Sequence, residues 1–290
     1  MSGEIGAAGN SDNSYHVVTG NSLAGALIDG VIIQDGNTQG AATDADDDGG
    51  GVYNKEKLTL KNVVVRNNTA SDDGGGIRND GDLTVVNSTI ADNVALSNSS
   101  STSGGGGLIN TLGSSATLVG TTFSGNQAKA GGAIRNDGQM TLVNTTLSGN
   151  LASESGGGLS NTTSDPLNPF AVSATVILIN STITNNEDQN SSGQNFNGAG
   201  VANFGSLTTK NSIIAGNNNN DDIRNHFVGN SLSEGNNIIG NGGSISGFTN
   251  GTNNDFVGSE ISPVDPLLGA LQDNGGFTQT HVPTSNSVAI

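Results

Sequence analysis

The sequence lacks cysteine and tryptophan, and only two of its 290 residues are tyrosine. Without cysteine the chain can form neither a disulfide nor a thiolate metal site. Nine Lys and Arg stand against 26 Asp and Glu, and the formal net charge of −17 repels the phosphates of nucleic acids. No apolar run reaches the length of about 18 residues that a membrane-spanning helix requires. We therefore expect neither a nucleic-acid partner nor membrane insertion.

Glycine and asparagine are abundant instead: 45 residues are Gly, and Asn outnumbers all charged residues together. Hydrophobic residues make up only 32% of the chain, which alone would suggest disorder. Once glycine is counted with them, the fraction reaches the usual level of a globular protein. No segment of helical length carries a 3.6-residue apolar period, so we expect few helices.

A glycine-rich motif recurs along the chain. Three small residues, mostly Gly, precede an aliphatic residue, any residue and an Asn, at 49–54, 74–79, 105–110, 131–136, 156–161 and 198–203. A short strand of alternating polar and apolar residues follows each motif, and the unit closes with a second Asn at position 68, 93, 126, 150, 186 or 217. These closing positions lie 24 to 36 residues apart. A spacing that never falls below 24 residues but often exceeds it is typical of a coil in which each turn needs a fixed number of residues and any additional residues form loops.

This pattern predicts an all-β protein, a single right-handed parallel β-helix of about eight to ten rungs, each rung being one turn of the chain. A β-sandwich or propeller would need hairpin pairs of strands, which the units lack. We expect one domain over 1–290, with the first rungs in 1–48, regular rungs in 49–240 and an irregular segment in 241–290. Both ends read as if cut from a longer chain.

The repeat also predicts which side chains stack on one another. Two internal columns are expected, at 60, 85, 118, 142 and 178 and at 65, 90, 123, 147 and 183. A ladder of internal amides is expected from Asn62, Asn87, Asn144, Asn180 and Asn211, with Gly120 as its gap. Outward hydroxyls form a column of Thr59, Thr84, Thr117, Thr141 and Thr208 and a second column of Thr89, Thr122, Thr146 and Thr182.

Three stretches carry a resemblance to a known family. They are Asp12–Gly20 with Leu27–Ile33, the glycine motifs, and the closing Val264-Asp265-Pro266-Leu267-Leu268-Gly269 with Leu271–Thr278. Together they resemble the secreted bacterial right-handed β-helix proteins of the choice-of-anchor Q or polymorphic outer membrane protein-like type. The resemblance implies a passenger or stalk part of a larger protein, located outside the cell or on the bacterial surface. It implies no particular activity.

Acidic residues precede the first two glycine motifs and are the candidate metal ligands. In register, Asp47 lies over Asp72 and Asp48 over Asp73, about 5 Å apart. Stacked carboxylates repel unless a cation bridges them, and their hard oxygens suit Ca²⁺. The alternative is that these side chains, with Asp44 and Asp46, are simply solvated.

An enzyme is the alternative to a structural module. Arg78 and Arg135 share one repeat position, with Asp80 and Asp137 beside them, and could form the Arg/Asp site of a polysaccharide lyase or hydrolase acting on an acidic polysaccharide. The same residues could equally be two surface ion pairs of little energetic value. The three His are scattered without the spacing of a metal site or catalytic triad.

The sequence thus favours a structural or adhesive module that displays the loops at 38–48, 94–104, 162–173 and 187–197 to an extracellular or cell-surface polysaccharide or protein. Calcium is the one candidate cofactor, and we lean against catalysis. Ice binding by the outward threonines is a remote alternative, since Thr is also the polar residue best suited to a pleated sheet.

Overall fold

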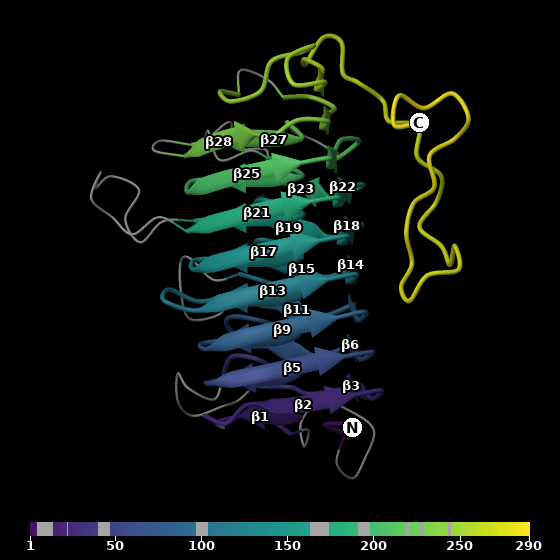
Figure 1. Ribbon diagram of the computed structural model, residues 1–290. Helices are drawn as coiled ribbons and strands as arrows, with labels where there is room; N and C mark the ends of the chain where they lie inside the picture. Colours follow the sequence, from purple (N-terminus) through teal and green to yellow (C-terminus); the bar gives the residue numbers. More distant parts are fainter. Residues whose placement is uncertain are drawn as a thin grey trace.

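The computed structural model describes residues 1–4, 14–21, 23–39, 47–96, 104–162, 174–190, 198–218, 221–226, 229–242 and 245–290. Within these ranges the chain is all β, and none of it forms a helix that could cross a membrane. The strands stack into four parallel sheets, each of which takes one strand from successive rungs (Figure 1). The predicted parallel β-helix is therefore confirmed.

Sheets I and II each contain eight strands and lie one after the other along every rung. Sheet I follows the glycine motifs and consists of β1 (Val18–Gly20), β4 (Val52–Asn54), β8 (Ile77–Asn79), β12 (Leu108–Asn110), β16 (Ile134–Asn136), β20 (Leu159–Asn161), β24 (Val201–Asn203) and β27 (Ile223–Asn225). Sheet II consists of β2 (Ala26–Asp29), β5 (Lys57–Lys61), β9 (Asp82–Val86), β13 (Ser115–Val119), β17 (Gln139–Val143), β21 (Thr175–Ile179), β25 (Ser206–Lys210) and β28 (Asn230–Ser233).

Sheets III and IV complete the rung. Sheet III consists of β3 (Ile32–Gln34), β6 (Val64–Arg66), β10 (Thr89–Ala91), β14 (Thr122–Ser124), β18 (Thr146–Ser148), β22 (Thr182–Thr184), β26 (Ile213–Ile214), β29 (Ile238–Ile239) and β30 (Phe256–Val257). The shorter sheet IV consists of β7 (Thr69–Ala70), β11 (Val94–Ala95), β15 (Gln127–Ala130), β19 (Leu151–Ser155) and β23 (Glu187–Asp188). The sequence predicts one alternating strand per unit, whereas the structure places three or four short strands in most rungs.

Stacked aliphatic side chains fill the interior, in the two columns that the sequence predicts. In sheet II the register pairs Val85 with Leu118 and Leu118 with Leu142, all of them fully buried. In sheet III Ile90 and Leu147 flank Phe123 in the same way. Removing each such side chain from water contributes about 1.5–3 kcal/mol, so these columns are the main stabilising feature of the coil.

The predicted internal ladder of Asn62, Asn87, Asn144, Asn180 and Asn211 is wrong, because the one bond between its members, from Asn211 Nδ2 to Asn180 Oδ1 at 2.8 Å, lies on the exposed surface. These residues have φ values between 47° and 52°, and Gly120 at the same position has φ 59°. The left-handed conformation turns the chain between sheets II and III and points the side chains outward, so four of the five are exposed and Asn87 is half-buried. Their role is to make a corner rather than to satisfy the interior.

The buried amide ladders are built instead by the two Asn residues that define the repeat. At the end of sheet I, each Asn donates through Nδ2 to Oδ1 of the Asn one rung further, at 2.7–2.9 Å, through Asn54, Asn79, Asn110, Asn136, Asn161, Asn203 and Asn225. The closing residues form a second ladder in which both the main-chain N and Nδ2 donate to the next Oδ1, through Asn68, Asn93, Asn126, Asn150, Asn186 and Asn217. These bonds satisfy the polar groups of the bends inside the coil.

The second ladder ends on a carboxylate. Asn217 donates its main-chain N and its Nδ2 to Asp222 Oδ1, at 2.8 and 2.7 Å, and Asn241 N donates to Asp222 Oδ2. A shorter ladder lies between sheets II and III, where Ser181 N donates to Ser212 Oγ and Ser212 N donates to Asn237 Oδ1. Asn237 in turn donates its main-chain N and its Nδ2 to Asp255 Oδ1. Both acids are 3% exposed and lie near the C-terminal end of the coil.

The C-terminal strap, residues 265–290, returns along the outside of sheet III (Figure 1). Thr122 Oγ1 donates to Gln279 O at 2.7 Å, and His281 Nε2 lies 2.9 Å from Ser148 Oγ. Thr122 and Thr146, two members of the second predicted threonine column, are consequently buried. The strap's own turns are held by antiparallel bridges between Leu268 and Pro283 and between Gln272 and Thr280.

The loops predicted to face partners fall largely outside the described residues. Their segments 40–46, 97–103, 163–173 and 191–197 belong to the part of the chain that the structure does not describe, together with Asp44 and Asp46. The strands on either side of each segment keep their register, as the pairing of β12 with β8 and of β20 with β24 shows.

Candidate functional site

The glycine motifs place the predicted acidic residues at a tight bend between sheets IV and I. Gly49 has φ 63°, and a Cβ on Gly75 would lie 2.5 Å from Val94 O and 2.7 Å from Gly106 O. A side chain at Gly75 would meet both backbones, so glycine is required at this position, whereas Ala199 fits the same position in the last motif. The carboxylates immediately before the motif are therefore held close to the next rung.

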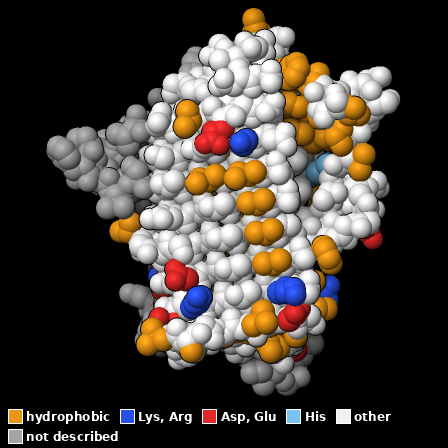
Figure 2. All heavy atoms as spheres, in the orientation of Figure 1, with side chains coloured by type: hydrophobic (Ala, Val, Ile, Leu, Met, Phe, Trp, Pro, Cys, Tyr) orange, Lys and Arg blue, Asp and Glu red, His pale blue; other side chains and the backbone are white. Residues whose placement is uncertain are grey.

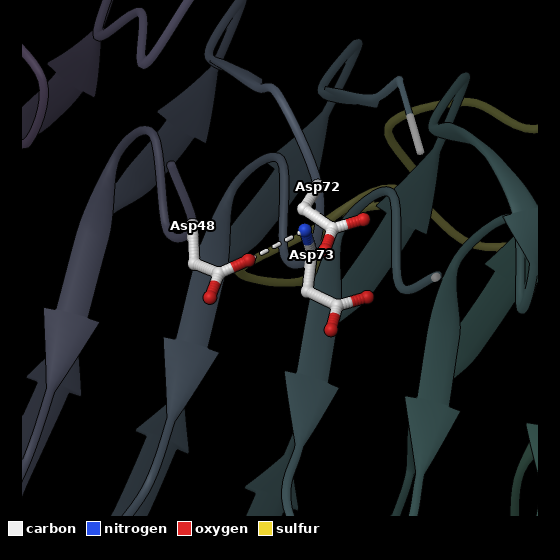
Figure 3. Close-up of side chains that lie close together, drawn as sticks. All are labelled: Asp48, Asp72 and Asp73. Atoms are coloured by element: carbon white, nitrogen blue, oxygen red, sulfur yellow. Dashed lines mark hydrogen bonds between the residues drawn. The ribbon is translucent and has the colours of Figure 1, made fainter. Parts of the chain in front are cut away.

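Three of the four predicted ligands come together there. One carboxylate oxygen from each of Asp48, Asp72 and Asp73 lies within 4.8 Å of the other two (Figure 3). Asp47, the fourth, is not part of this group; its main-chain O accepts hydrogen bonds from Ser71 N at 2.9 Å and Asp72 N at 3.2 Å. Asp47 and Asp72 are thus joined through their main chains, and the carboxylate of Asp47 does not join the group of three.

The carboxylates also bond to the bends of the following rungs. Asp48 Oδ1 accepts a hydrogen bond from Asp73 N at 2.7 Å (Figure 3), and Asp73 Oδ1 accepts one from Gly104 N at 2.6 Å. Each acid therefore satisfies an amide one rung further on. This arrangement gives the acidic residues a structural role that requires no metal.

Arg78, a candidate catalytic residue, lies beside the acidic group and joins it to Asp80. Its Nη1 forms an ion pair with Asp48 Oδ2, and its Nε lies 3.0 Å from Asp80 Oδ1. Tyr53 OH donates to Asp80 Oδ2 at 2.9 Å, and the Tyr53 ring lies 5.5 Å from the guanidinium carbon. The predicted metal ligands and the predicted catalytic residues Arg78 and Asp80 therefore form one cluster, whereas the sequence predicts two separate sites.

Arg135 and Asp137 repeat the arrangement two rungs further along sheet I. Arg135 makes a two-pronged contact with Asp137, at 2.9 and 3.0 Å. Ile109 lies between Arg78 and Arg135 in the register and is 2% exposed, so the two guanidiniums do not share one open surface. The side chain of Arg135 is itself only 14% exposed.

Burial controls the acidity of the site. It raises the pKa of Asp48 to about 7, although Arg78 lowers it, and raises the pKa of Asp73 to about 6 against the opposing effect of Arg135. Burial, together with the hydrogen bond to Asp80, raises the pKa of Tyr53 to about 12. The cluster therefore has an incomplete negative charge below neutral pH.

This geometry limits the chemistry that the cluster can perform. A Ca²⁺ ion held by one oxygen from each of the three carboxylates would need three to five further oxygen ligands, and Arg78 already neutralises Asp48. Both guanidiniums make charge-assisted bonds within the chain, which leaves fewer of their donors for an anionic sugar. The arrangement is better suited to holding rungs together than to binding a substrate.

Sequence reasoning missed the residues that complete the cluster. Thr111 Oγ1 donates to Asp80 Oδ1 at 2.9 Å, and Thr162 Oγ1 donates to Asp137 Oδ1 at 2.5 Å. Each Thr follows the motif Asn of the next rung, and this shared position was the available signal. Lys55 Nζ, which lies 4.4 Å from the centre of the Tyr53 ring, carried no such signal.

Comparison of the chain with known protein families, with curated proteins and with solved structures finds no match. The resemblance to choice-of-anchor Q and polymorphic outer membrane protein-like proteins therefore stays a prediction.

Proposed function

We propose that this chain is a rigid structural or adhesive module that presents loops on a β-helical rod. The observation that carries the proposal is the second amide ladder, which runs without interruption from Asn68 to Asn217 and ends on Asp222. Since each rung is bonded to the next by buried side chains as well as by the sheets, bending the rod would break several bonds at once. Stiffness of this kind serves display rather than turnover.

The spacing of the rungs supports display. Ladder partners lie 24 residues apart between Asn126 and Asn150 but 36 apart between Asn150 and Asn186. The additional residues do not disturb the register of the coil, because β18 still pairs in register with β22. A scaffold that tolerates insertions at fixed positions can present variable loops to a partner.

The partner in this proposal is an extracellular or cell-surface polysaccharide or protein, and the module acts outside the cell or on the bacterial surface as part of a larger protein. The resemblance noted above supports this location. The charge of −17 keeps such a module soluble.

A binding screen with matched loop variants tests the proposal. The intact chain is immobilised and exposed to acidic and neutral polysaccharides and to extracellular proteins, beside variants in which 97–103 or 163–173 is replaced by Gly and Ser of equal length. We expect saturable binding that one loop variant loses while its circular dichroism and melting temperature stay unchanged. Release of new unsaturated or reducing ends from a polysaccharide, abolished in Arg78→Ala or Arg135→Ala, would instead establish the lyase or hydrolase alternative.

We also propose that Ca²⁺ is the cation that the Asp48, Asp72 and Asp73 group takes. Support comes from the proximity of the three carboxylate oxygens and from their hard-ligand chemistry. At pH 8, above the pKa values of Asp48 and Asp73, millimolar Ca²⁺ should raise the melting temperature relative to a chelator, and Asp72→Asn should remove the increment while Glu234→Gln keeps it. An identical melting temperature in Ca²⁺ and chelator would contradict this proposal without affecting the display function.

A further inference from the structure

The outer face of sheet II carries two regular columns of side chains, of which Figure 2 shows the aliphatic one and the strand register gives the other. The threonine column consists of Thr59, Thr84, Thr117 and Thr141, then Ile177 and Thr208. Two residues further along each strand, the valine column consists of Val86, Val119, Val143 and Ile179. Strands lie about 4.8 Å apart, so each column is evenly spaced along the rod.

This face is apolar in its middle and extends to exposed leucines at both ends. The valine column is half-buried, Ile177 is 36% exposed, and Leu27 and Leu232 at the two ends of the threonine column are 63% and 54% exposed. Contiguous apolar side chains of this kind mark an interaction surface. The threonine hydroxyls between them can hydrogen-bond across an interface.

Within the valine column, charge is found only at the two ends, and Lys57 and Asp82 place a further base and acid at the start of β5 and β9 on the same face (Figure 2). Asp29 and Lys61 precede Val86 in the register, and Lys61 Nζ lies 3.8 Å from Asp29 Oδ2. At the other end Lys210 follows Ile179, and Glu234 follows β28 in the next rung. The column thus reads acid, base, four aliphatic residues, base, acid.

We propose that a second copy of this chain packs face to face on sheet II, with the two rods antiparallel and related by a two-fold axis parallel to the strands. That symmetry places each column opposite its own counterpart with the order of rungs reversed. A shift of one rung brings either Asp29 opposite Lys210 of the second copy or Lys61 opposite Glu234 of the second copy, twice in each case. Without the shift, Lys61 would face Lys210; with parallel rods, Lys61 would face Lys57.

The available area sets the strength of this dimer. Seven overlapping rungs about 4.8 Å apart, on strands of roughly 16 Å, give an interface on the order of 500 Å² per copy. Stable complexes bury about 800 Å² per partner, and smaller interfaces are typically transient. The dimer is therefore weak and reversible, with a Kd of roughly micromolar magnitude.

Sedimentation velocity of the intact chain over a range of concentrations tests this proposal. The weight-average mass should rise toward that of a dimer, and Val119→Arg should raise the Kd at least about tenfold because it places a charge in the centre of the apolar column. Gln127→Arg, at an exposed position on sheet IV, is the matched control and should leave the Kd unchanged. A monomer at every concentration, or equal effects of the two variants, would overturn the proposal.

Charge exchange tests the register. Lys210→Glu or Lys61→Glu should weaken the dimer, and the second change, Asp29→Lys or Glu234→Lys respectively, should restore it for the pair that faces across the axis. Rescue by neither pair would reject the antiparallel arrangement. Inhibition of ice recrystallisation by a strictly monomeric chain, lost in Val119→Arg, would show that ordered water rather than a second copy covers this face.

Discussion

At the scale of single residues, asparagine does two different jobs in this protein. The ladder residues are buried and use both ends of the amide, whereas Asn144 and its equivalents turn a corner with positive φ. The sequence predicts the ladder at the wrong set because both sets recur once per rung. Gly120 was the discriminating signal: glycine replaces asparagine readily where φ is positive, but it cannot replace an amide that bonds to two neighbours.

The same substitution should therefore have opposite outcomes at the two kinds of site. Asn126→Gly removes the acceptor of Asn93 N and Nδ2 and the donor to Ile90 O, and should lower the free energy of unfolding by about 3 kcal/mol or more. Asn144→Gly keeps the left-handed turn and should change it by less than about 0.5 kcal/mol. Urea unfolding of both variants measures the difference, and similar losses would refute the assignment of roles.

Buried ionisable residues predict an unusual dependence of stability on pH. Burial raises the pKa of Asp48 to about 7 and those of Asp73 and Asp188 to about 6, so between pH 4 and 6 the folded chain binds protons that the unfolded chain does not. Stability should fall as pH rises through this range. Burial lowers the pKa of His226 to about 4, which opposes the trend below pH 6.5, but this one group acts against the three acids above and against Asp221 and Asp222, whose pKa values burial also raises.

Urea unfolding at several pH values measures this trend. We expect the free energy of unfolding to be higher at pH 4.5 than at pH 7.5, and Asp48→Asn to flatten the remaining slope between pH 6 and 7. A free energy that rises with pH across this range would show that the carboxylates are stabilised as anions in the folded chain.

At the scale of elements, the strap is the part of the fold that sequence reasoning did not place. The two internal columns, which run from Leu60 to Leu178 and from Val65 to Ile183, could be predicted from the alternation of polar and apolar residues, because burial of one face fixes the register of a strand. The strap meets sheet III through main-chain and hydroxyl contacts, such as Thr278 Oγ1 to Gly120 O, and no apolar periodicity encodes them. The pairing of Arg78 with Asp48 was equally hidden, since it depends on how far a long side chain reaches between rungs.

His281 should determine whether the strap stays docked. Its ring bridges Gly269 O, at 2.6 Å, and Ser148 Oγ, so His281→Ala removes contacts both within the strap and to the coil. We expect faster hydrogen exchange at the amides of Gln272 and Thr280, which bond to each other, by roughly fivefold to thirtyfold for a loss of about 1–2 kcal/mol. The Gln139 amide, which bonds to Ser114 O at sheet II and away from the strap, should exchange as before and is the internal control.

At the scale of the whole molecule, the coil behaves as a linear array of equivalent units. Each rung contacts only its neighbours, so stability is approximately a sum of rung and interface terms. Asn68 and Asn93 hold equivalent positions 25 residues apart, and the same sheets continue on either side of them. The fold therefore does not depend on a particular number of rungs.

Removal of one complete rung should leave the protein folded. Deletion of residues 69–93 joins Asn68 to Val94 in register and should shorten the rod by about 4.8 Å while keeping a cooperative thermal transition. Deletion of residues 69–80 moves inward-facing side chains out of register and should abolish that transition. Small-angle scattering and circular dichroism compare the two, and equal behaviour of both deletions would contradict a register-bound coil.

The ending of the amide ladder on Asp222 has a consequence for how such proteins change in length. The amide of each ladder Asn accepts a hydrogen bond from the preceding rung and donates one to the following rung. A carboxylate has no donor, so it can only accept, and the ladder ends there. Asp222→Asn would keep the oxygen that accepts from Asn217, lose the bond that Oδ2 accepts from Asn241 N, and supply an N–H donor to an additional turn. Whether the amide ladder can continue into another rung therefore depends on Asp or Asn at this position, and a single nucleotide change converts one residue into the other.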